Sequence, residues 1–179
     1  QVAVDARRLG EVADAVPQGR RPGILTEDAD PAAGDDLDPD DGWNTPRADR
    51  LAAYRGREAA ALDWIDATFD EAERTGAPGV LLAMQANPAL DSAPGSRARR
   101  GFDAVVERIV QRTRRLGRPV LLAHGDTHHQ RVDRPLADTP GLLRVENFGP
   151  EALQWVEIQI DAGHPEVFRV RTHRASGAS

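Results

Sequence analysis

The sequence predicts an α/β fold with mixed sheets, and three hydrophobic patterns along the chain support this. Apolar residues three and four apart indicate amphipathic helices, and short apolar runs that follow them indicate buried strands. Towards the C-terminus, apolar and polar residues alternate one by one, which is typical of half-buried antiparallel strands. A chain of 179 residues is long enough for one domain with a sizeable core.

The predicted domain organisation divides near residue 50. Residues 1–50 are rich in Pro and Gly, carry the acidic tract TEDADPAAGDDLDPDDGW and show no sustained period. We expect an irregular segment here, with one short helix near residues 6–15 and loose packing of residues 17–46 around Trp43. The aspartates of DDLDPDDG alternate as in a calcium loop, but Arg47 stands where such a loop has its bidentate glutamate. We therefore interpret the tract as a solvated acidic loop.

The folded part is expected over residues 51–179, and it begins with a helix over residues 51–75. The apolar face of this helix consists of Leu62, Ile65, Phe69 and Ala72. Acidic residues and arginines occupy the opposite face, and the sequence GAPG ends the segment.

A strand, a helix and a second strand follow. The apolar runs GVLLAMQ and PVLLAH predict buried strands at 79–85 and 119–124, and the residues between them predict an amphipathic helix over 97–116. Two strands joined in this way form a right-handed crossover and lie parallel. We interpret the arginines of this helix as its polar surface rather than as a phosphate-binding stripe.

Three alternating segments complete the chain. They are LLRVENF, LQWVEIQID and EVFRVRTH, and loops that contain Gly and Pro separate them. We expect antiparallel strands with one buried face each.

The composition excludes several classes of function. A net charge of −6 argues against binding of nucleic acid or of anionic membranes. The sequence contains no cysteine, which excludes thiolate metal sites and disulfides, and no lysine, which excludes a P-loop lysine and Schiff-base chemistry. No apolar run is long enough for a membrane span, and nothing in the sequence assigns a compartment.

Three of the five histidines lie in the stretch VLLAHGDTHHQR, directly after the second buried strand. The carboxyl ends of such strands are where open α/β sheets place their ligand sites. His124, Asp126 and His128 alternate, and imidazole together with carboxylate suits Mn, Fe, Zn or Ni better than Ca. The alternative is a polar surface turn. The α/β-hydrolase elbow Gly-x-Ser-x-Gly is absent, and Gly125 after a strand is wrong for the helical zincin motif.

Four segments carry a resemblance to a known family: GVLLAMQANP, PVLLAHGDTHHQRVDRPL, LLRVENFG and WVEIQIDAGHPEVFRV. They resemble the C-terminal half of the calcineurin-like metallophosphoesterases, in particular a bacterial branch with His-Gly-Asp-Ser/Thr-His where most members have Gly-His-x-His. The resemblance covers roughly residues 50–173 and is most specific over residues 119–136. It implies a four-layer α/β/β/α sandwich in which two divalent ions (Mn, Fe or Zn) catalyse hydrolysis of a phosphate ester.

The same resemblance suggests which residues bind metal. His128 matches the second motif histidine, a metal ligand in the family, and Asp126 takes the place of the first. Gln85 stands where most members have another metal-binding histidine, and His124 is an additional candidate. Gln85 could offer only a neutral amide oxygen or a supporting hydrogen bond. No residue is assigned as a catalytic acid, base or nucleophile.

The upstream motifs of the family are absent from this sequence. Members carry Asp-x-His, Gly-Asp-x-x-Asp and Gly-Asn-His-[Asp/Glu], and only the superficial match GDDLD at residues 34–38 is present. The only methionine is Met84. We therefore expect the chain to be the C-terminal portion of a metal-dependent phosphoesterase, inactive on its own. The alternative is a catalytically inactive scaffold of the same fold that serves as a binding or interaction module.

Overall fold

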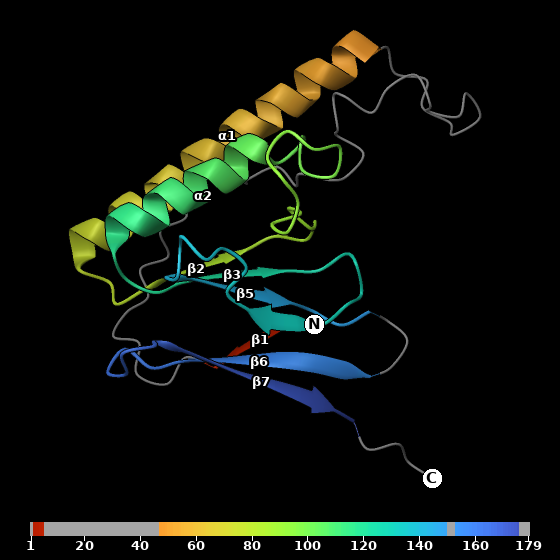
Figure 1. The fold of residues 1–179 in the computed structure, drawn as a ribbon. Helices are drawn as coiled ribbons and strands as arrows, with labels where there is room; N and C mark the ends of the chain where they lie inside the picture. The colour runs from red at the N-terminus through yellow and green to blue at the C-terminus, as the bar shows by residue number, and fades with distance from the viewer. Residues whose placement is uncertain (1, 6–46, 150–152, 176–179) are drawn as a thin grey trace.

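The computed structural model describes residues 2–5, 47–149 and 153–175, which stack in three layers (Figure 1). Two helices cover one face of a four-stranded sheet, and a three-stranded sheet covers the other face. The described part is therefore an α/β structure with mixed sheets, as the hydrophobic patterns predict. Neither described helix has the length and apolar character that crossing a bilayer requires.

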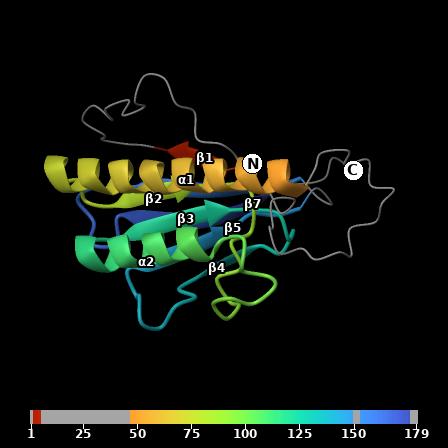
Figure 2. The same ribbon diagram turned by 90° about the horizontal axis from the view of Figure 1, so that it is seen from above.

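The helix layer consists of α1 (Arg47–Thr75) and α2 (Asp103–Leu116), which lie side by side over the sheet (Figure 2). Helix α1 begins four residues earlier than expected. Helix α2 begins later, because residues 97–102 form turns instead of a first helical turn. Gly117 ends α2 in the left-handed conformation (φ 63°), with its N–H donating to the carbonyl of Thr113.

The arginines of α2 form ion pairs with the acidic face of α1. The pairs are Arg108 with Asp66, Arg112 with Asp70, and Arg115 with Glu73. Our interpretation of these arginines as a plain polar surface is therefore incomplete, since three of them join the two helices.

The central sheet has the order β2-β3-β5-β4. Its strands are β2 (Val80–Ala83), β3 (Val120–His124), β5 (Leu142–Glu146) and β4 (Arg131–Asp133). The predicted crossover is confirmed, because β2 and β3 are adjacent and parallel and α2 joins them. The prediction that residues 142–148 pair only antiparallel is wrong. Strand β5 runs parallel to β3 and antiparallel only to β4, a three-residue strand that the patterns did not predict.

The second sheet has the order β1-β6-β7. Strands β6 (Gln154–Ile160) and β7 (Phe168–Arg174) are antiparallel, as predicted, and β1 (Val2–Asp5) pairs parallel with β6. The expected irregular segment thus contains a strand at its start and the first turn of α1 at its end. The expected helix near residues 6–15 and the loose packing of residues 17–46 fall outside the described residues.

The central sheet separates two hydrophobic cores. Along β3, Val120 and Leu122 face the helices, whereas Leu121 and Ala123 face the second sheet. Every residue of β3 is buried as a result. By the same alternation, His124 at the end of β3 lies on the helix side of the sheet.

Candidate functional site

The carboxyl ends of β2, β3 and β5 meet at one edge of the central sheet, and backbone hydrogen bonds join the segments that follow them. Gly125 N–H donates to the carbonyl of Gln85 at 3.0 Å. Asn147 N–H donates to the carbonyl of His124 at 2.9 Å. The sheet therefore brings the segments that carry Gln85 and His124 together, as their positions after parallel strands predict.

His124 is the most enclosed of the predicted site residues, with only 3% of its surface exposed. Its Nδ1 lies 3.1 Å from the carbonyl oxygen of Gly125, which can only accept a hydrogen bond, so Nδ1 carries the proton. Nε2 is then the nitrogen with a free lone pair, and it is buried without a hydrogen-bond partner among the described residues. This is the tautomer that suits a metal ion or a proton donor at Nε2.

Burial lowers the pKa of His124 below 6.5, although the Gly125 carbonyl and the Glu146 carboxylate oppose the shift. The imidazole is therefore neutral at neutral pH, as binding of a cation through Nε2 requires.

The turn after β3 contains two residues in unusual backbone conformations. Asp126 has φ 89° and His128 has φ 63°, and neither is a glycine. Such conformations cost roughly 1–3 kcal/mol each and occur preferentially at functional sites. The Asp126 carboxylate lies 3.5 Å from the backbone N–H of Asn87, which ties this turn to the segment after β2.

Of the predicted metal ligands, Asp126 and His128 lie in this turn, His124 directly precedes it and Gln85 lies on the segment after β2, but their side chains are not gathered around one point. Within residues 47–149 and 153–175, no group of three or more His, Asp or Glu side chains is arranged to hold an ion. The side chain of His124 is buried, that of Asp126 is half-buried, and those of Gln85 and His128 are exposed.

Sequence reasoning missed a network of buried charges beside this turn. Arg144 and Glu146 on β5 are 1% and 0% exposed. Arg144 donates from Nε and Nη2 to Asp133, at 2.8 and 2.6 Å, and from Nη1 to Asp91 at 2.8 Å. Burial alone would lower the pKa of Arg144, but the hydrogen bonds to Asp133 and Asp91 outweigh it and raise this pKa.

A signal for this network does exist in the sequence. The tripeptides Arg-Val-Asp at 131–133 and Arg-Val-Glu at 144–146 pair antiparallel, with Arg131 opposite Glu146 and Asp133 opposite Arg144. Each arginine therefore lies across from a carboxylate, a cross-strand arrangement that stabilises a sheet. Once β4 is recognised as a strand, the complementary charges predict its register against β5.

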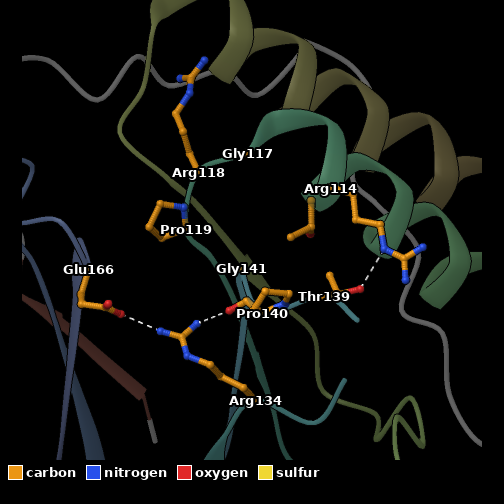
Figure 3. A pocket seen from close by; sticks show the side chains of 10 residues that line it. Arg114, Gly117, Arg118, Pro119, Arg134, Thr139, Pro140, Gly141 and Glu166 are labelled. Atoms are coloured by element: carbon orange, nitrogen blue, oxygen red, sulfur yellow. Dashed lines mark hydrogen bonds and ion pairs between the residues drawn. The ribbon is translucent and has the colours of Figure 1, made fainter. Parts of the chain in front are cut away.

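A hollow of about 530 Å³ lies at the opposite end of the central strands, before β3 and β5 (Figure 3). Its arginines are already engaged. Arg134 joins the carbonyl of Pro140 to Glu166, Arg114 contacts Thr139, and Arg118 points away toward the carbonyls of Ala72 and Ala77. We interpret this hollow as part of the structural contact between the two sheets.

Comparison of the chain with models of known protein families, with curated proteins and with solved structures found no match.

Proposed function

We propose that this chain forms part of a metal-dependent phosphoesterase of the calcineurin-like type, with its site at the carboxyl edge of β2 and β3. The observation that carries the proposal is His124, a buried histidine whose Nε2 has no hydrogen-bond partner among the described residues, at the start of a strained His-Gly-Asp-Thr-His turn. The three observed layers agree with three of the four layers of the metallophosphoesterase sandwich. We propose the fourth layer of that sandwich as well, a helical cover on the outer sheet.

The chemistry of the residues at this edge suits a divalent transition metal. His124 would bind through Nε2, because the Gly125 carbonyl holds the proton on Nδ1. Asp126 and His128 would add a carboxylate and an imidazole, and Gln85 would add an amide oxygen or a supporting hydrogen bond. When bound, such ions polarise a phosphate ester and lower the pKa of a water molecule for in-line attack.

The residues of the chain would contribute position and charge. The buried His124 stays neutral and holds its lone pair in one direction, while Asp126 offsets part of the charge of the cation. A dinuclear centre takes about twice the number of ligands that these residues supply. Under this proposal, the remaining ligands come from outside the described residues.

A titration with Co²⁺, followed by its visible absorption, tests the metal site. We expect one weak site, competed by Mn²⁺ and Zn²⁺, which His124→Asn and His128→Asn weaken by at least about tenfold. His173→Asn is the matched control, because His173 lies on β7 and contacts Glu157. Absence of Co²⁺ binding, or equal loss in all three variants, would contradict the proposal.

Calorimetry with inorganic phosphate tests the esterase part of the proposal. We expect phosphate to bind measurably tighter when Mn²⁺ is present, because a phosphoesterase metal contacts the phosphoryl oxygens. Metal binding without any effect on phosphate would instead favour the inactive scaffold.

A further inference from the structure

We propose that Glu146 is the positioning residue of the turn over residues 125–130, and that it sets the directions of Asp126 and His128 by holding both ends of that turn. The inference rests on the proposed function, because it names the residue that holds the proposed metal-binding turn in place.

The carboxylate of Glu146 is fully buried, and its two oxygens have different partners. Oε1 accepts a hydrogen bond from the Thr127 hydroxyl. Oε2 accepts from Nε and Nη2 of Arg131, at 2.9 and 2.6 Å. Thr127 lies near the start of the turn and Arg131 directly follows it, so a single carboxylate holds the turn from both sides.

Thr127 is placed where such support is needed. It stands between Asp126 and His128, the two residues of this turn with positive φ. Because their backbone conformations are unfavourable for L-residues, contacts nearby must hold them in place. The hydroxyl of Thr127 supplies one such contact, to a carboxylate that is itself fixed in the sheet.

Each guanidinium nitrogen of Arg131 and Arg144 already donates to a carboxylate, which favours a supporting role over phosphate binding. Arg131 uses Nε and Nη2 on Glu146 and Nη1 on Asp91, at 2.7 Å. Arg144 likewise uses Nε, Nη1 and Nη2 on Asp133 and Asp91. Asp91 thus joins the two arginines and connects the loop after β2 to β4 and β5.

A buried carboxylate is costly, and an apolar side chain in its place could give a sheet of similar stability. The contacts of Glu146 supply a reason for a charge here. An apolar residue could not hold the Thr127 hydroxyl and the Arg131 guanidinium in fixed directions.

Thr127→Val tests the proposal most cleanly, because it removes the hydroxyl and keeps the shape of the side chain. We expect amide hydrogen exchange over residues 125–130 of the metal-free protein to become at least about tenfold faster, and Co²⁺ affinity to fall about 10–100-fold with an altered visible spectrum. Thr127→Ser, which keeps the hydroxyl, should restore both properties. Glu146→Gln should resemble Thr127→Val, because the amide nitrogen that replaces one carboxylate oxygen cannot accept a hydrogen bond from the partner at that position.

Glu166→Gln is the control, since it breaks a carboxylate–arginine pair at the other end of the sheet and should change neither readout. Wild-type exchange and wild-type Co²⁺ affinity in Thr127→Val would overturn the proposal, as would a failure of Thr127→Ser to restore them. If Glu146→Gln does not fold, Thr127→Val still decides. If the wild-type chain binds no Co²⁺, the proposed function fails, and the exchange measurement alone decides whether Glu146 holds the turn.

Discussion

His124 and Glu146 lie in register on the parallel strands β3 and β5, and both side chains are buried at the same sheet edge. Their hydrogen bonding differs. Both carboxylate oxygens of Glu146 have partners, whereas Nε2 of His124 has none within the part of the chain that the structure describes. The edge therefore combines a fixed anion with an imidazole that is open to a further ligand.

The buried imidazole predicts a dependence of stability on pH. Burial lowers the pKa of His124 in the folded state below 6.5, so the unfolded chain binds the proton more readily. The free energy of unfolding should then fall as pH drops below about 6.5, down to the pKa of the folded state. Urea denaturation at several pH values measures this dependence. The free energy of unfolding should change less steeply with pH in His124→Asn than in the wild type. The exposed His129, changed to Asn, is the control, and equal slopes in both variants would contradict the prediction.

Replacing glycine by alanine should have opposite effects on stability at Gly79 and Gly56. A Cβ on Gly79 would lie 2.7 Å from the carbonyl oxygen of Pro119, so Gly79→Ala must push β2 away from the start of β3. We expect a loss of about 1–3 kcal/mol in the free energy of unfolding. Gly56 lies inside α1 with nothing within 4 Å of its added Cβ, and Gly56→Ala should stabilise by about 0.5–1 kcal/mol. Thermal or urea denaturation measures both changes, and a neutral Gly79→Ala would contradict the observed approach of the two backbones.

The two cores can be tested with adjacent leucines. Leu121 faces the second sheet and Leu122 faces the helices, and both are almost fully buried. Each change to Ala should cost about 2–5 kcal/mol. Val132→Ala on β4, where 42% of the residue is exposed, should cost far less. A small effect at Leu121 in urea denaturation would show that the second sheet does not cover the central one.

Periodicity predicted the elements whose environment is uniform along their length. The strands at residues 80–83 and 120–124 are apolar at nearly every position, because the central sheet is covered on both faces. The same reasoning failed for β5. In LLRVE the polar residues alternate with apolar ones, which indicates a solvent-facing side, yet Arg144 and Glu146 are buried. Ion pairs with Asp133, Asp91 and Arg131 replace water there, and local periodicity contains no information on such distant partners.

The sequence predicted where the residues of the candidate site lie, but not the hydrogen bonds that hold them. Gly125 after a buried strand placed His124 and the turn at the sheet edge, and the structure has them there. The tautomer of His124 depends on one carbonyl, and the support of Thr127 depends on a strand 19 residues further along the chain. The first contact joins adjacent residues and the second joins distant ones, but both depend on the folded backbone, so the sequence pattern around the histidines could not indicate them.

The buried network predicts unequal effects of one substitution at two ion-paired aspartates. Asp133 pairs with Arg144, of which only 1% is exposed, so Asp133→Asn leaves a buried guanidinium with a single carboxylate partner, Asp91. We expect a loss of about 3 kcal/mol in the free energy of unfolding, because a buried charge that loses one of its carboxylate partners is costly. Asp138 pairs with Arg114 at the surface, where the side chains are 73% and 48% exposed, and Asp138→Asn should cost less than about 1 kcal/mol. The difference should persist in 1 M NaCl, which screens the exposed pair more than the pair of Arg144, because the guanidinium of Arg144 is buried. Urea denaturation of both variants at low and high salt measures these losses in the free energy of unfolding. Equal and salt-sensitive losses would mean that solvent reaches Arg144. The turn would then lack the rigid support assigned to it.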